Sequence, residues 1–217
     1  MKKLKSKLGF TIAELVIAIV LVAGIAMILM PSLVADNERQ VFATSLKKIY
    51  TDLQQTNQAV GLLMARGQIT SGTSAIETLK KAAIKSMKLT APKTYAGYLK
   101  GYDIDGATPA TEFKYYEDDE TRNNILILKN GVFLQFTDDY LLIDVNGRKQ
   151  PNETGRDVYY LSVNQNAEDN SLIIAPFDYN DTYKCPEKNK KLGCADAKEC
   201  KGCAKRVLEE TGRIDWY

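Results

Sequence analysis

The sequence predicts an α+β protein, in which a long N-terminal helix packs on an antiparallel sheet and disulfides staple the C-terminal segment. Three observations lead to this fold class. Apolar residues first form an unbroken run and then recur at helical spacing up to about residue 64; beyond residue 124, short apolar runs alternate with turn residues; and all four cysteines lie in the last 33 residues. A helix followed by consecutive strands is a layered α+β arrangement.

Composition narrows the classes of function. The chain has 217 residues, of which 45% are apolar and 26% charged, as expected for one folded domain with an N-terminal addition. Its 29 basic and 27 acidic side chains form no excess of the kind that nucleic-acid binding requires. The sequence contains no histidine, the commonest general base and metal ligand, so we do not expect an enzyme.

The first 35 residues combine a basic start with a long apolar run. Met1 to Gly9 carries four lysines, and Leu15 to Ala35 (LVIAIVLVAGIAMILMPSLVA) runs for 21 residues without a charge. At about 1.5 Å per residue, such a helix spans the roughly 30 Å of a bilayer's hydrocarbon core. The run exceeds the roughly 7–15 apolar residues of a signal peptide. We therefore expect a single-pass membrane helix with a cytoplasmic N-terminus and an extracytoplasmic head.

Glu14 places a carboxylate at the start of this apolar segment. An ionisable group inside a membrane segment costs about 2.5–3.5 kcal/mol on insertion scales and is a candidate functional residue for that reason. If the chain were cut after Gly9, Phe10 would carry a new α-amino group, and Glu14 of one copy could pair with the Phe10 amine of the next. The alternative is that Glu14 lies at the membrane surface and is solvated.

A basic leader that ends in Gly9, followed by Phe10-Thr11-x-x-Glu14-Leu15 and a long apolar helix, resembles the start of type IV prepilins and type II secretion pseudopilins. This resemblance implies the pilin fold, cleavage between Gly9 and Phe10 by a prepilin peptidase, N-methylation of Phe10, and an assembly role for Glu14. The implied partners are other pilin-like subunits in a filament, assembly platform proteins of the inner membrane, and membrane lipid.

These observations predict four segments. They are a leader over residues 1–9, a membrane and filament-core helix over 10–35, the amphipathic half of the same helix over 36–66, and a head over 67–217 with a cysteine-rich tail at 185–203. The helix is expected to run from about Phe10 to Met64, with Pro31 kinking or loosening it. Apolar residues at helical spacing in its second half predict core packing.

The head is predicted to hold a short helix and five strands. The helix runs from about Ser74 to Met87. Asn130-Gly131 between two apolar runs is the strongest short-range signal for a β-hairpin. The predicted strands cover residues 125–128, 132–136, 141–145, 157–163 and 172–174.

The connection between the third and fourth strands contains the candidate metal ligands Asp144, Asn146 and Asp157. It also looks like a loop that recurs in pseudopilin-like heads, and its oxygen-bearing side chains suit calcium as a cofactor. The EF-hand pattern fails because Leu142 occupies the place of the first carboxylate. Turn-forming residues explain the stretch sufficiently, so we favour a structural turn over a calcium site.

The sequence predicts two disulfides among its four cysteines, Cys185, Cys194, Cys200 and Cys203. An even number of cysteines in an extracytoplasmic segment with little core is typical of disulfide stapling. Three pairings are open, and Cys185–Cys194 is preferred for its shorter loop. A zinc site that uses Cys200-x-x-Cys203 is the less favoured alternative, because the eight-residue gap before Cys194 does not suit it.

Two functions follow as hypotheses. The first is a structural subunit of a type IV pilus or of a secretion or DNA-uptake pseudopilus. The second is an uncleaved, membrane-anchored binding module with the same head. Only the first requires a cut between Gly9 and Phe10.

Overall fold

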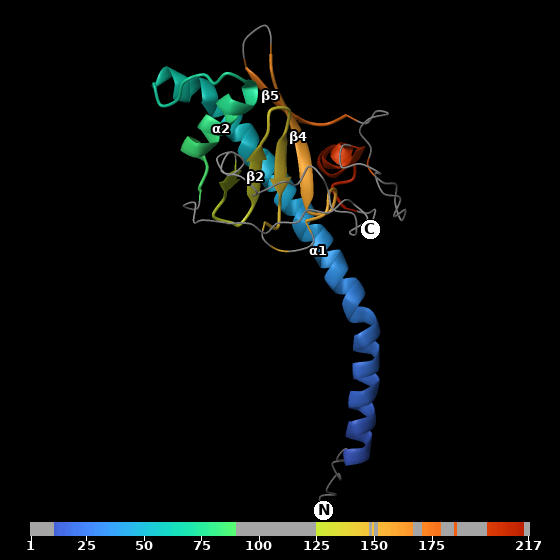
Figure 1. Ribbon diagram of the computed structural model, residues 1–217. Coiled ribbons are helices and arrows are strands. Elements are labelled where there is room, and N and C mark those ends of the chain that lie inside the picture. Colours follow the sequence, from blue (N-terminus) through green and yellow to red (C-terminus); the bar gives the residue numbers. More distant parts are fainter. Residues whose placement is uncertain are drawn as a thin grey trace, which may run out of the picture. The chain divides into compact units, whose positions relative to one another are not determined.

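The computed structural model describes residues 11–89, 125–147, 149, 152–166, 171–178, 185 and 199–214. The chain divides into two units, one ending at Glu38 and one beginning at Arg39, and each is described by itself. The prediction of an α+β arrangement with a long N-terminal helix and an antiparallel sheet is confirmed (Figure 1).

Helix α1 spans Ile12–Ala65 and continues through Pro31. Its end is a glycine cap: Gly67 has a φ of 65°, and the N–H groups of Gly67 and Gln68 donate to the carbonyls of Met64 and Leu63 at 2.9 Å. This pair of bonds satisfies carbonyls that the helix leaves open, and the left-handed conformation suits glycine. The helix therefore ends within a residue of the place that the sequence predicted.

The sheet is a five-stranded antiparallel meander in the order β1-β2-β3-β4-β5. The strands are β1 (Ile125–Ile127), β2 (Phe133–Phe136), β3 (Leu141–Asp144), β4 (Val158–Gln165) and β5 (Leu172–Pro176). The predicted hairpin joins β1 and β2, with Gly131 at a φ of 89°. All five strands lie where the alternation of apolar and turn residues predicted them.

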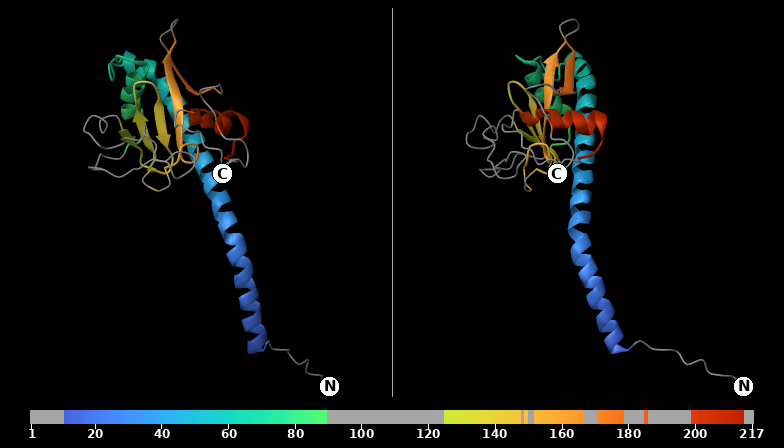
Figure 2. Two further views of the ribbon diagram at one scale, coloured as in Figure 1. Left: turned by 45° about the vertical axis from the view of Figure 1, so that its right-hand side comes forward. Right: turned by 90° about the vertical axis from the view of Figure 1, so that its right-hand side faces the viewer.

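One face of the sheet carries the main core. The buried stripe of α1 (Ala43, Leu46, Ile49, Leu53 and Val60) belongs to the same apolar cluster as Leu134, Ile143, Tyr159 and Leu161 of the strands. Both views in Figure 2 show this part of α1 lying along the sheet. The stripe recurs every three or four residues, as a helix with one buried side requires.

The free edge of the sheet at β5 is covered by polar side chains of α1. Gln54 Nε2 donates to the carbonyl of Ile174 at 2.8 Å, and Asn57 Nδ2 donates to the carbonyl of Leu172 at 2.7 Å. Tyr50 also donates to Ile174 at 3.4 Å. Pro176, two residues on, has no N–H to offer at this edge. Helix and proline together close an edge that would otherwise pair with another strand.

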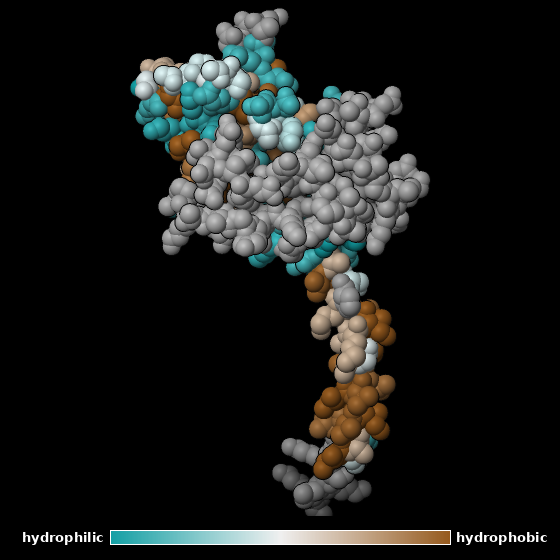
Figure 3. Space-filling model, viewed as in Figure 1, coloured by the Kyte–Doolittle hydropathy of each residue, from teal (hydrophilic) through white to brown (hydrophobic). Residues whose placement is uncertain are grey.

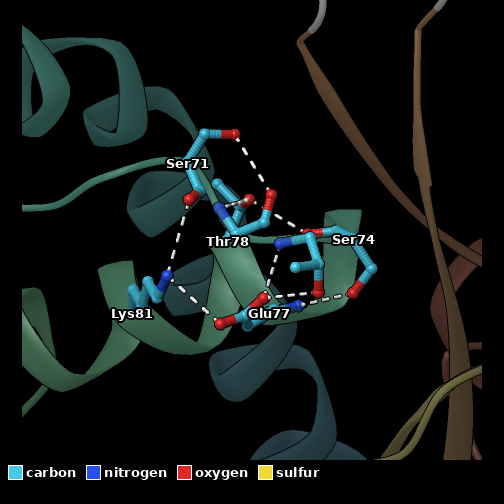
Figure 4. Close-up of polar contacts among 7 residues, drawn as sticks. Ser71, Ser74, Glu77, Thr78 and Lys81 are labelled. Atoms are coloured by element: carbon cyan, nitrogen blue, oxygen red, sulfur yellow. Dashed lines mark hydrogen bonds and ion pairs between the residues drawn. The ribbon is translucent and has the colours of Figure 1, made fainter.

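Helix α2 (Ala75–Ser86) starts with a dense set of capping bonds (Figure 4). Ser74 Oγ accepts the N–H of Glu77 at 3.2 Å, while Glu77 Oε2 accepts the Thr73 N–H at 2.5 Å and the Thr73 hydroxyl at 2.7 Å. Lys81, one turn on, pairs with Glu77 at 3.1 Å. The carboxylate is stabilised in its charged form, and the pKa of Glu77 falls from 4.5 to about 2, chiefly through the Thr73 backbone bond.

The C-terminal segment packs against both sides of the sheet. It is a 3-10 turn (Glu199–Gly202), a short helix α4 (Cys203–Lys205) and a π-helical turn (Arg206–Glu210). Cys203, Ala204, Val207 and Ile214 join the main core. Lys201, only 6% exposed, holds its ammonium 4.1 Å from the ring centre of Tyr140, in the second apolar cluster. A desolvated contact of this kind contributes up to about 2 kcal/mol.

A first prediction concerns the buried stripe of α1. Leu53→Ala should lower the free energy of unfolding by about 2–5 kcal/mol, because Leu53 is fully buried and the substitution leaves a cavity. The matched control is Leu62→Ala on the same helix, whose side chain is 52% exposed and whose loss should cost about 0.5 kcal/mol or less. Denaturant unfolding of the full chain in detergent measures both, and equal losses would contradict the packing described.

A second prediction concerns Glu77 and acid. Since its pKa is lower in the folded chain than in the unfolded one, Glu77 stabilises the fold above pH 4.5, and this stabilisation is lost as the pH falls towards 2. Glu77→Gln should therefore lower the melting temperature near neutral pH and converge with the parent chain near pH 2. Glu209→Gln is the control, because Glu209 contacts Lys205 at 3.7 Å and no backbone donor among the described residues. Parallel curves for the parent and Glu77→Gln would refute the assignment.

Candidate functional site

The start of α1 carries the candidate assembly residue Glu14. Its side chain is exposed, and Oε2 accepts the Thr11 N–H at 2.9 Å and the Thr11 hydroxyl at 2.8 Å. In return, Thr11 Oγ1 accepts the N–H of Glu14 at 3.2 Å. This reciprocal arrangement is a capping box, in which two backbone donors of the first turn are satisfied by side chains. Gly9 and Phe10 lie outside the described residues.

The capping role of Glu14 was not predicted from the sequence. Its signal is the pattern Thr-x-x-Glu directly before an apolar run, which Thr11 to Glu14 matches. The box engages Oε2 alone, and Oε1 accepts no hydrogen bond from the residues that the structure describes. Glu14 therefore caps its own helix with one carboxylate oxygen and leaves the other without a hydrogen bond from the described residues.

The residues that follow Glu14 form an apolar surface. From Leu15 to Val34 the large apolar side chains of α1 are more than half exposed (Figure 3). By length and composition, α1 is the one helix among those described that is able to cross a membrane, with a mean hydropathy of 2.9 in its most apolar 18-residue window. In water this surface would be costly, at about 25 cal/mol per Å², so lipid or another apolar surface is its expected surrounding.

The β3–β4 loop gathers the three candidate calcium ligands as a turn. Asp157 Oδ2 accepts Asn146 Nδ2 at 2.7 Å and the Asn152 N–H at 2.8 Å, and Oδ1 accepts the Glu153 N–H at 2.5 Å. Asp144 Oδ1 accepts the N–H of Gly147 at 2.7 Å and of Asn146 at 3.2 Å. Both carboxylates are buried. They act as acceptors that organise the backbone of the loop.

Glycine is required at one point of this loop. Gly147 has a φ of 64°, and a Cβ there would overlap the carbonyl oxygen of Gly131 in the β1–β2 turn. The two connections therefore lie in direct contact, and Asp144 fixes the approach by accepting the Gly147 N–H.

Burial changes the acidity of the two carboxylates. Desolvation, opposed by the Asn152 and Glu153 backbone bonds, raises the pKa of Asp157 from 3.8 to about 6. Desolvation followed by repulsion from Asp157 raises the pKa of Asp144 well above its ordinary value. Burial is the first cause of both shifts, and repulsion from a neighbouring carboxylate adds to it, from Asp157 for Asp144 and from Glu153 for Asp157.

As a calcium site, the described part of this loop fits poorly. Calcium takes six to eight oxygen ligands. Here Asn146 turns its amide nitrogen towards Asp157, and backbone N–H groups already point at both carboxylates. No group of three or more His, Cys, Asp or Glu side chains is placed to hold a metal within the described ranges. The geometry supports the structural turn.

The cysteines pair differently from the preferred expectation. Cys185 is bonded to Cys203 across 18 residues of sequence, so the preference for Cys185–Cys194 was wrong. The shorter loop is favoured by closure entropy, but Cys203 is held in the main core at 1% exposure, and Cys185 packs against the same cluster. Because its sulfur is in this disulfide, Cys203 is not available as a thiolate ligand for the alternative zinc site. Cys194 and the side chain of Cys200 lie outside the described residues.

No family model, curated protein or solved structure matches the chain. Evidence about function therefore comes from the sequence pattern and from the geometry of α1 and the β3–β4 loop.

A third prediction follows from Asp157. Its pKa is higher in the folded chain than in the unfolded one, so the fold should lose stability as the pH rises from about 4 to about 6, by on the order of 3 kcal/mol. Asp157→Asn should flatten this part of the stability curve, whatever its effect on absolute stability. Melting temperatures of the full chain between pH 3.5 and 7 test this.

The same curves, recorded with calcium and with a chelator, test the turn against a calcium site. The turn predicts that the two curves coincide. A melting temperature that rises with calcium near neutral pH, and does so in the parent chain but not in Asp157→Asn, would show that the loop binds the ion.

Proposed function

We propose that this chain is a type IV pilin-like subunit, a pilin or pseudopilin that is held in the membrane by α1 and assembles into a filament through it. The support comes from the order of elements, from the apolar surface of the N-terminal part of α1, and from Glu14. The order of a long helix followed by an antiparallel meander is also that of the pilin fold, which the sequence resemblance implies.

The observation that carries the proposal is the carboxylate oxygen of Glu14 that the capping box does not use. A capping box by itself explains why glutamate is favoured three residues after Thr11. It does not require an apolar surface to follow directly. Because Glu14 directly precedes the apolar surface, its Oε1 atom is available to a cation from another chain. The amine created by a cut before Phe10 is such a cation. In the low dielectric of a membrane or filament core, such a pair fixes the register between subunits.

The processing step in this proposal is a peptide hydrolysis. Prepilin peptidase would cut between Gly9 and Phe10, and a methyltransferase would then methylate the new amine. The rival function, an uncleaved anchored binding module, retains the leader. The N-terminal residue and the mass of protein taken from the native membrane separate the two. A chain that begins at methylated Phe10 supports the filament subunit, and a chain that begins at Met1 in cells with active prepilin peptidase overturns it.

A fourth prediction separates the two roles of Glu14. Glu14→Gln keeps an acceptor for the Thr11 donors but removes the charge, whereas Glu14→Ala removes both. If Glu14 pairs with an amine, both variants should lower filament assembly by roughly 100-fold, as the loss of about 3 kcal/mol from a buried ion pair implies.

The control for this pair of variants is helix content and membrane insertion, which Glu14→Gln should leave unchanged. Filaments sheared from cells and quantified by mass measure assembly. If Glu14→Gln assembles normally and only Glu14→Ala fails, capping is the whole role of Glu14.

A further inference from the structure

A second candidate site lies in the head and uses the part of α1 that follows Arg39. A cavity of about 440 Å³ opens between α1, the end of α2 and the turn that joins β1 to β2. This volume is within the range of small-molecule sites. Its described lining consists of Lys48, Asp52, Gln55, Thr56, Ser86, Met87, Lys88, Leu128, Lys129 and Asn130.

The described lining of this cavity carries a net positive charge. Lys48, Lys88 and Lys129 come from three different parts of the fold, and none of their ammonium groups makes a hydrogen bond or ion pair within the described chain. Asp52 is the one carboxylate among the lining residues that the structure describes. Lys81 of α2, by contrast, pairs with Glu77. Three positive charges thus face one negative charge around a single opening.

At the buried side of the cavity, the direction of the hydrogen bond between two hydroxyl groups can be assigned. Thr56 is 3% exposed, and its Oγ1 lies 3.0 Å from Ser86 Oγ. Because Ser86 Oγ donates to the carbonyl of Ala82 at 2.9 Å, Thr56 must be the donor of the pair between the hydroxyls. Oγ1 of Thr56 therefore offers lone pairs to a ligand, as do Asp52 and Gln55 nearby. These atoms accept hydrogen bonds from hydroxyl groups.

We propose that this cavity binds a phosphate monoester that also carries hydroxyl groups, of the glycerol phosphate or sugar phosphate class. A phosphate monoester has a charge of about −1.5 to −2 at pH 7, which offsets the excess of the three lysines over Asp52. Lysine binds phosphate as a point charge from any direction, so three separate stems suit it. Met87 and Leu128 supply apolar contact for the carbon skeleton.

The test is calorimetric titration of the full chain in uncharged detergent. Glycerol 3-phosphate should bind more tightly than inorganic phosphate, because it adds hydroxyl donors, and more tightly than the dicarboxylate malate. Binding should weaken at high salt, since the lysines are exposed. Absence of binding to glycerol 3-phosphate at low salt, or equal binding of malate, would overturn the proposal.

Charge variants test the place of binding. Lys48→Gln, Lys88→Gln and Lys129→Gln should each weaken glycerol 3-phosphate about fivefold, which corresponds to an exposed ion pair of about 1 kcal/mol. The matched control is Lys85→Gln, an exposed lysine of α2 outside this cavity, which should change nothing. Equal losses for Lys85→Gln and Lys88→Gln would show non-specific attraction and overturn the site.

Two further measurements define the ligand. Thr56→Val should weaken glycerol 3-phosphate but leave inorganic phosphate unchanged, so a variant that merely disturbs the fold is recognised by the loss of both. Vesicles that contain phosphatidic acid, compared with vesicles of phosphatidylcholine alone, distinguish a lipid headgroup from a soluble phosphate. Selective binding to the former, lost in Lys88→Gln, would support a lipid source for the same chemistry. No preference, together with binding of soluble glycerol 3-phosphate, would support a soluble ligand.

Discussion

The contact between the second half of α1 and the sheet is the interaction on which the head depends. The meander has one apolar face, which includes Leu134, Ile143 and Leu161, and a stripe of α1 that includes Leu46, Ile49 and Leu53 lies in the same core. Burying a leucine or isoleucine contributes about 1.5–3 kcal/mol, so this stripe supplies a large part of what holds sheet and helix together. Helix α2 and the C-terminal segment add side chains to this core.

One continuous helix thereby serves two different surroundings. Up to Val34 its large apolar side chains are exposed, whereas from Ala43 to Val60 a stripe of apolar side chains is buried in the core. Charged residues return to the helix at Asp36, between these two stretches. An all-round apolar surface suits lipid or a helical partner, and a single stripe suits a sheet. The proposed assembly role uses the first stretch, and the phosphate cavity uses residues of the second.

Much of the fold could be predicted from the sequence because its signals are local. Apolar residues at spacings of three and four predicted α1, and short apolar runs between turn residues predicted the strands. Asn130-Gly131 predicted the hairpin turn. The disulfide partner of Cys185 could not be predicted, because it depends on which cysteine the core buries. The contact of Lys201 with Tyr140 joins residues 61 positions apart, and no local pattern announces it. The capping role of Glu14 has a local signal, Thr-x-x-Glu, and was therefore predictable from the sequence.

The polar contacts at β5 have a consequence for where the chain tolerates shortening. Gln54 and Asn57 occupy the carbonyls of Ile174 and Leu172, which would otherwise form an open hydrogen-bonding edge. A head separated from the apolar N-terminal segment by a cut before Arg39 keeps both side chains and the buried stripe. A cut after Asn57 removes them together, and leaves an apolar face beside an unpaired strand. That combination promotes edge-to-edge aggregation, so the second half of α1 also protects the head from self-association.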